Sequence, residues 1–411
     1  MPDRSSRILK TAAYYLSFLA LGMTTATVGP TLPYLADQTG SLLSTVSLLF
    51  SARAIGFLLF SLLAGRLYDR VKGHPVMAAA LIVLALTMAL VPSAPLLWLL
   101  ALVFLVLGMA EATADIGGNT LLVWVHGHRV GPFMNGLHFF FGLGAFLTPI
   151  MVAMVVLASD GIGWAYRIVA LLALPVAAWL LLLPSPKAAA YTSDESTRRR
   201  GRAAARGRRG ILVALFAAFF LLNVGAEIGF GGWVFSYAVV SGLASVANAA
   251  YLTSAFWGAL TLGRLLAIPI SARARPSLIL LGDLAGCLIS LGIIILWPDA
   301  PQALWVGTFG MGLSMASIIP VTMSLAERRL IITGKTTGWF FVGTSLGVMS
   351  LPWLMGQLFE GISPFAAIIA LLITILAALG VLVALLSYSG RHAADLGSGP
   401  GGQRLASGDA S

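Results

Sequence analysis

The stretch Gly-Arg-Leu-Tyr-Asp-Arg-Val-Lys-Gly-His at residues 65–74 connects two long apolar runs, and it decides the fold. Gly65 has no side chain, so it lets two helices approach closely at this point. Asp69 is a carboxylate that can accept hydrogen bonds from the N-terminus of a neighbouring helix, where the helix dipole favours an anion. An ordinary basic loop around Arg70 is the alternative interpretation. The pattern therefore predicts packed helices whose ends meet at this loop.

The composition on both sides of this loop is that of a membrane protein. Hydrophobic residues make up 59% of the 411 residues and charged residues only 10%, whereas a soluble domain carries about 25% charged residues. Lipid must therefore surround much of the chain. One helical span needs about 20 apolar residues. The sequence contains twelve such runs, at 9–34, 43–66, 75–92, 96–124, 131–157, 163–183, 211–240, 246–270, 276–297, 301–327, 336–358 and 363–388.

Two polar segments divide and end this series of runs. Residues 184–210 hold eight lysines and arginines, which predicts a solvated linker. Residues 391–411 are rich in Gly and Ser, which predicts a disordered tail. Two six-helix bundles remain, at 1–183 and 211–390, and the tripeptide Gly-Arg-Leu recurs in the second one at 263–265. The sequence predicts an all-α polytopic membrane protein with 6+6 pseudo-symmetry and a solute site between its halves.

The basic residues predict the orientation in the membrane. Of 25 lysines and arginines, 20 lie at the two ends, in the linker and in the even-numbered loops, and two more, Lys10 and Arg66, lie at the ends of the first and second runs on the same side. The other three, Arg53, Arg167 and Arg264, lie inside predicted helices. The loops on the opposite side carry only acids: Asp37, Asp160, Asp299 and Glu360. Positive residues stay on the cytosolic side, so we expect both termini to be cytosolic in a plasma-membrane protein. This placement explains the net charge of +10 without a nucleic-acid partner. We expect a monomer.

Three polar side chains follow one stripe of the predicted fourth helix. Glu111, Asp115 and Asn119 are spaced at i, i+4 and i+8, which stacks them on one helix face. A mid-membrane charge costs about 2.5–3.5 kcal/mol on insertion scales, and two carboxylates one turn apart repel each other. A bound proton or sodium ion would relieve this repulsion, so Asp115 and Glu111 are predicted to couple to a cation. Alternatively they pair with Arg53 of the second helix and only hold helices together, while Arg53 itself either pairs with a carboxylate or donates to a solute.

Other polar and aromatic residues inside the predicted spans are further candidates. Glu227 lies among glycines in the seventh helix and is a third candidate for cation coupling. Arg264 and Asp283, near the cytosolic ends of consecutive helices, predict a structural or gating pair. Candidate solute contacts, with a core or interfacial-anchor role as the alternative, are Asn119, His138, Asn223, Trp233 and Trp257. Five histidines and a single cysteine indicate no metal centre.

Residues 65–74 resemble the signature loop of the major facilitator superfamily, Gly-x-Leu-x-Asp-Arg followed by basic residues. Further stretches resemble the sodium-dependent glucose transporters and related major-facilitator-domain-containing proteins, near the fucose–proton symporters: Gly29–Leu32, Asp115–Asn119, His138–Phe139, Val224–Glu227 and Phe256–Trp257. The resemblance covers essentially all twelve runs. It implies that Asp69 meets the start of the eleventh helix, near Thr336, and that Gly65, Asp69 and Arg70 gate the transporter. It also places His138 where the fucose branch carries a substrate-binding glutamine.

The function that this resemblance implies is secondary transport of a small polar solute, a monosaccharide, by alternating access with a proton or sodium ion and no cofactor. The first helix lacks the carboxylate that fucose symporters use, so the coupling ion stays open. An exporter of drugs or lipids in the same fold is the alternative, although it would need a wide apolar cavity. A membrane-embedded enzyme or a channel is a third class, for which the sequence offers no His-Glu-x-x-His ligands and no Gly-x4-Gly-Lys-Ser/Thr loop for ATP.

Overall fold

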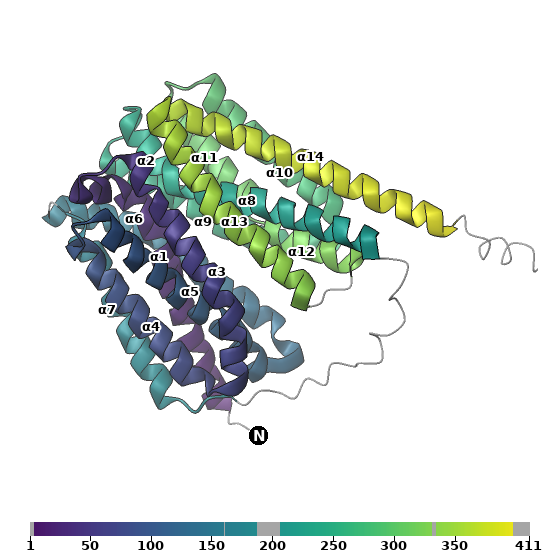
Figure 1. The fold of residues 1–411 in the computed structure, drawn as a ribbon, viewed down its shortest axis with the longest axis horizontal. Coiled ribbons are helices and arrows are strands. Elements are labelled where there is room, and N and C mark those ends of the chain that lie inside the picture. The colour runs from purple at the N-terminus through teal and green to yellow at the C-terminus, as the bar shows by residue number, and fades with distance from the viewer. Residues whose placement is uncertain (1–3, 160, 187–205, 331–333, 398–411) are drawn as a thin grey trace, which may run out of the picture.

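The computed structural model describes residues 4–159, 161–186, 206–330 and 334–397, and within these ranges it contains helices and no strands (Figure 1). The α-helices are α1 (Arg4–Thr39), α2 (Leu43–Val46), α3 (Leu48–Arg70), α4 (Gly73–Leu90), α5 (Leu97–His126), α6 (Gly131–Ser159), α7 (Gly163–Leu182), α8 (Arg206–Val240), α9 (Val246–Arg273), α10 (Pro276–Leu296), α11 (Pro301–Met315), α12 (Ile318–Arg329), α13 (Gly334–Gly361) and α14 (Pro364–Gly397). Two short 3-10 helices, η1 (Val91–Ser93) and η2 (Gly127–Arg129), lie in the loops after α4 and α5.

Eleven helical stretches in the described residues are long and apolar enough to cross a membrane. α2 with α3, and α11 with α12, each supply one of these stretches. α1 is not among them, because threonine and tyrosine lower its hydropathy. Its threonines nevertheless fit an apolar setting, since Thr24, Thr27 and Thr31 each donate to the carbonyl four residues earlier. The all-α class is confirmed, and a count of twelve spans stays a prediction.

Several boundaries differ from those predicted. α8 begins at Arg206, inside the expected linker, and α14 continues to Gly397, past the expected end at residue 390. The predicted tenth span is divided into α11 and α12 by a turn at Ala316 and Ser317. Helical backbone hydrogen bonds can continue wherever the chain has amide N–H groups, so a change in side-chain polarity did not end these helices. The rest of the predicted linker, 187–205, and of the tail, 398–411, lies outside the described residues.

The helices gather into two groups, α1–α7 on one side and α8–α14 on the other (Figure 1). Inside the first group, α3 and α5 pack closely because glycines stand where they cross. A Cβ on Gly56 would lie 1.9 Å from the carbonyl oxygen of Leu105, and one on Gly108 would lie 2.0 Å from that of Arg53. Small residues let membrane helices approach in this way. The crossing brings Arg53 of α3 level with the middle of α5.

The two groups meet at the end of the molecule that holds residues 40–44 and 361–363. We call it the outer end, because the charged residues in its loops are acidic, and we call the opposite end the inner end. The main-chain N–H of Ser44 donates to Glu360 (2.7 Å), and Gln357 donates to the Ser44 carbonyl (2.8 Å). Ser47 and Ser51 of the first group donate to main-chain carbonyls of α13, at Trp353 and Met349. α2 and the end of α13 lie together in Figure 1, and the helices diverge toward the opposite, inner end.

Candidate functional site

A cavity of about 740 Å³ lies between the two groups of helices. α1, α3, α5 and α6 line one side of it, and α8, α9, α12 and α13 line the other. Its polar lining residues are Thr25, Arg53, Glu111, Asp115, Asn135, His138, Glu227, Thr261, Arg264, Ser271, Thr344 and Ser345. Because Asn135 and Ser271 lie near the inner ends of their helices, the cavity extends toward the inner end, while the hydrogen bonds described above close the outer end.

Arg53 and Glu111 form a two-pronged ion pair in the cavity wall. The Nε atom of Arg53 lies 2.6 Å from Glu111 Oε2, and its Nη2 atom lies 2.7 Å from Oε1. The same Nη2 donates to the hydroxyl of Thr25 on α1 at 2.8 Å. The planar guanidinium matches a carboxylate in this geometry. Of the two roles considered for Arg53, the structure therefore shows pairing with a carboxylate, and that carboxylate is Glu111.

Glu227 and Arg264 form a looser pair on the other side of the cavity. The Nη2 atom of Arg264 lies 3.4 Å from Glu227 Oε1. The predicted pair between Arg264 and Asp283 is therefore wrong for this conformation. Asp283 accepts a hydrogen bond from Ser317, at the turn between α11 and α12, instead. The reason lies in the helix packing, because the arginine side of α9 faces α8 and the cavity, whereas Asp283 on α10 faces α11 and α12.

Asp115 is the carboxylate of the cavity that no basic side chain neutralises in the described part of the chain. Its carboxylate accepts a hydrogen bond from the Asn119 amide at 3.3 Å, and the same amide donates to the Asp115 carbonyl at 2.9 Å. Since Glu111 and Glu227 each have an arginine, the cavity holds three carboxylates against two arginines. With all five groups ionised, one negative charge is left, and it lies on Asp115.

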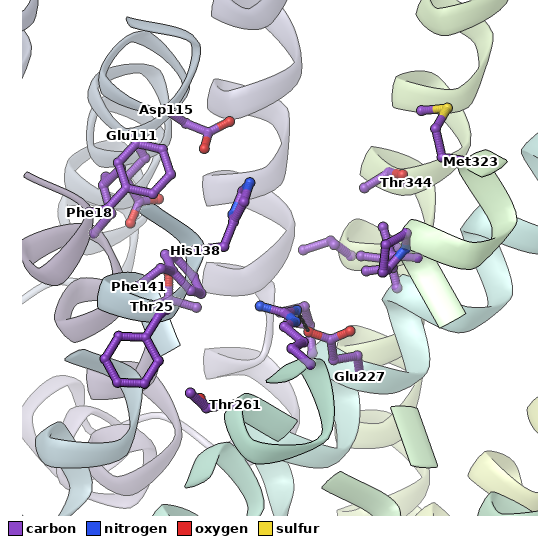
Figure 2. Close-up of a pocket in the computed structure, with 18 of the residues that line it drawn as sticks. Phe18, Thr25, Glu111, Asp115, His138, Phe141, Glu227, Thr261, Met323 and Thr344 are labelled. Atoms are coloured by element: carbon purple, nitrogen blue, oxygen red, sulfur yellow. Dashed lines mark hydrogen bonds and ion pairs between the residues drawn. The ribbon is translucent and has the colours of Figure 1, made fainter. Parts of the chain in front are cut away.

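His138 lies on α6 and is exposed to the cavity. Figure 2 shows its ring projecting between Asp115 and Glu227. It contacts Phe18 edge-on, with ring centroids 5.8 Å apart, and forms no hydrogen bond with any residue that the structure describes. This placement differs from that of a satisfied core histidine. Both ring nitrogens remain available to a solute.

Four predicted solute contacts are not among the residues that line the cavity. Trp233 is buried and donates from its indole N–H to the Pro352 carbonyl at 2.9 Å. Trp257 is buried against Phe256. Asn223 donates to the Phe219 carbonyl, and Asn119 is engaged with Asp115. The cavity face of α8 carries Val224, Glu227 and Ile228. The side chains of Asn223 and Trp233 on the same helix are buried and do not reach the cavity.

The sequence interpretation missed other lining residues. They are the polar side chains Thr25, Asn135, Thr261, Ser271, Thr344 and Ser345 and the aromatic side chains Phe18, Phe57, Phe139 and Phe141. Phenylalanine is as suited to lipid as to a cavity, and a helical hydroxyl can satisfy itself on its own backbone. Residue type therefore carried little signal for these positions, and only Asn135 stood out as an amide inside a predicted span.

The predicted gate residues lie apart from the opposite group of helices in this conformation. Asp69 and Arg70 are exposed, and a Cβ on Gly65 would meet nothing within 4 Å. Asp69 accepts no hydrogen bond from the residues that the structure describes. The close helix approach expected at Gly65 is therefore absent here, because the groups are joined at the outer end and diverge at the inner end. Whether these residues gate the protein stays a prediction.

The geometry matches what comparison with known proteins finds. The family described as the Major Facilitator Superfamily matches residues 14–331. The mouse (Mus musculus) sodium-dependent glucose transporter 1A is 30% identical over 381 residues, covering 84% of this chain and 88% of that protein. The zebrafish (Danio rerio) major facilitator superfamily domain-containing protein 4A is 25% identical, covering 87% and 83%. Both belong to the group that the motifs of the sequence resemble, which confirms that resemblance.

Solved structures agree on the fold. The crystal structure of a D-xylose-proton symporter superposes with a TM-score of 0.74 at 16% identity, covering 91% of this chain and 97% of that one. The family match spans most of the chain, and the helices enclose a central cavity between two groups. The chain therefore belongs to the major facilitator superfamily of membrane transporters.

Proposed function

We propose that this protein is a cation-coupled symporter of a small polyhydroxylated solute, a monosaccharide, and that Asp115 carries the coupling ion. The observation that supports this most is the charge distribution of the cavity. Two ion pairs neutralise four of its charged groups, and Asp115 stays unpaired among the described residues. An isolated carboxylate in a membrane protein is costly, so binding one monovalent cation there is favourable. Cation binding would leave the cavity neutral overall, as suits an uncharged solute.

The cavity walls support a sugar as the solute. Arg53, Asn135 and His138 offer donors and acceptors on one side, and Thr261, Thr344 and Ser345 offer hydroxyls on the other. Phe18 and Phe141 present apolar rings to the same cavity. A monosaccharide has hydroxyls around its rim and C–H groups on its faces, so it needs both kinds of wall. The names of the relatives favour sodium as the ion, and a proton is the other candidate.

The test compares accumulation with exchange in proteoliposomes that contain the purified protein. Wild type is expected to concentrate radiolabelled D-glucose when an inward sodium gradient is imposed. Asp115→Asn keeps the size of the side chain and removes its charge, so it should abolish accumulation and retain exchange of labelled for unlabelled glucose. Asp37→Asn is the control, because Asp37 is an exposed acid outside the cavity.

Two outcomes would decide the coupling role, and a third would decide the solute. Accumulation by Asp115→Asn with normal ion dependence would move the role to another residue, of which Glu227 is the first to test. Accumulation driven by a pH gradient in the absence of sodium would identify the proton as the ion. No glucose transport under either gradient would contradict the proposed solute.

An exporter of apolar compounds is the second candidate, and one observation favours it. The inner part of the cavity is lined by apolar side chains, among them Ile268, Ile319 and Met323. Such a wall suits a lipid or a drug better than a sugar. Extrusion of an apolar fluorescent dye from the same proteoliposomes, without glucose uptake, would support this function over symport.

A further inference from the structure

Thr25 differs from the other hydroxyl-bearing residues of α1 in what its hydroxyl does. A Ser or Thr inside a helix commonly donates to the carbonyl four residues earlier. Six side chains of α1 do so: Thr11, Ser17, Thr24, Thr27, Thr31 and Thr39. Thr25 donates to no residue that the structure describes. Its oxygen only accepts, from Nη2 of Arg53 at 2.8 Å.

This arrangement leaves the Thr25 proton unused inside the cavity. A hydroxyl has one proton to donate and two lone pairs to accept with, and the guanidinium of Arg53 occupies one of the lone pairs. Thr25 is half-buried and lines the cavity. A hydrogen bond received from a charged donor polarises the hydroxyl and strengthens the bond that it donates in turn.

Neighbouring groups hold this hydroxyl in place. Arg53 is fixed by its two bonds to Glu111, and it therefore fixes the Thr25 oxygen. Phe141 lines the same cavity as Thr25. The result is a single oriented donor in a cavity that also has aromatic side chains in its wall. A sugar ring has hydroxyls for the donor and C–H faces for the aromatic side chains.

We propose that Thr25 donates a hydrogen bond to one oxygen of the transported solute and so determines which hydroxyl pattern the protein accepts. The inference rests on the proposed function, because it requires a polyhydroxylated solute. A site that donates to a substrate oxygen rejects an analogue that lacks the oxygen, since its own polar group is then left unpaired. Thr25 is thus a specificity-determining residue, distinct from Asp115, which carries the ion.

The test measures the KM for uptake of D-glucose and of its 1-, 2-, 3-, 4- and 6-deoxy analogues in proteoliposomes. Wild type is expected to discriminate against several analogues, each by roughly threefold to tenfold, the size of one hydrogen bond between uncharged groups. Thr25→Val removes the hydroxyl at nearly constant volume. It should raise the KM for glucose and remove the discrimination at one ring position only. Thr25→Ser should restore that discrimination.

Thr24→Val is the matched control, because Thr24 precedes Thr25 in the same helix but is fully buried and donates to the Ala20 carbonyl. It should leave the pattern of discrimination unchanged, and Thr25→Ala provides a second variant if Thr25→Val does not fold. A uniform change in KM for glucose and all analogues would show that Thr25 acts only by positioning Arg53, which overturns the inference. So would an unchanged pattern in Thr25→Val. If wild type transports none of these sugars, the proposed function fails and the inference fails with it.

Discussion

At the scale of single residues, the cavity is organised by which carboxylate has an arginine. Glu111 has both of its oxygens bonded to Arg53, whose side chain is 14% exposed against 5% for Glu111. Asp115, one turn farther along the same helix, has only the Asn119 amide. Two carboxylates that the sequence presents as equivalent therefore have different partners. Glu111 belongs to an ion pair between α3 and α5, and Asp115 has no basic partner among the described residues.

The stability of the protein should depend on the first carboxylate and its arginine. Arg53→Met leaves Glu111 buried without a partner, which we expect to lower the free energy of unfolding by about 3 kcal/mol. The double variant Arg53→Met with Glu111→Leu removes both charges and should recover most of that stability. Thermal unfolding of the proteins in detergent checks this, with Asp115→Asn as a variant expected to lose little. Equal instability of the single and double variants would contradict the pairing.

At the scale of the elements, close helix crossings determine which polar residues meet. α3 and α5 touch through Gly56 and Gly108, where added Cβ atoms would collide with main-chain oxygens. Backbone cannot retreat as a flexible side chain can, so a larger residue here must separate the helices. The separation would then pull Arg53 away from Glu111, which is three residues beyond Gly108.

Gly108→Ala tests this crossing. The methyl group would lie 2.0 Å from the Arg53 carbonyl oxygen, so we expect a loss of about 1–3 kcal/mol, the range for overpacked sites. Gly282→Ala in α10 is the matched control, because a Cβ there meets nothing within 4 Å. Melting temperatures of the two variants give the comparison. A Gly108→Ala protein as stable as Gly282→Ala would show that the crossing tolerates a wider spacing.

At the scale of the whole molecule, the two groups of helices are joined at the outer end and diverge at the inner end. Hydrogen bonds between the groups run from Ser44, Ser47 and Ser51 to the outer half of α13. The inner half of α13 contributes Thr344, Ser345 and Val348 to the cavity. One helix therefore connects the cavity to the hydrogen bonds that close the outer end.

Weakening the outer closure should shift the molecule toward the opposite conformation. Replacing both Gln357 and Glu360 with alanine removes two hydrogen bonds to Ser44. Positions 42 and 362 are both exposed and can carry spin labels on introduced cysteines. The distance between the two labels should be longer in the double alanine variant than in the labelled protein that keeps Gln357 and Glu360. Ser159→Ala is the control, because its hydroxyl bonds only within its own segment. Unchanged distance distributions would mean that other contacts hold this end closed.

Asp69 should affect the conformation in which the inner end is closed. It is exposed here, so Asp69→Asn is expected to leave thermal stability within about 0.5 kcal/mol of wild type, as for an ordinary surface change. If Asp69 meets the start of α13 when the inner end closes, the variant should disfavour that state and slow transport. Initial uptake rates and the same spin-label pair provide the measurement. A normal rate would exclude a gating role for this carboxylate.

The sequence by itself determined the membrane class, the helical segments and the superfamily, because these follow from the length and polarity of apolar runs and from a local motif. It also picked out Arg53, Glu111, Asp115, His138, Glu227 and Arg264, all of which line the cavity, since a polar group inside a span is conspicuous wherever it points. Only the tertiary structure decided how these groups are paired. Arg264 meets Glu227 and not Asp283, and Trp233 packs on α13 and does not line the cavity, because partners depend on helix rotation and crossing geometry. A helix in lipid is apolar all round, so its sequence does not reveal which face turns inward.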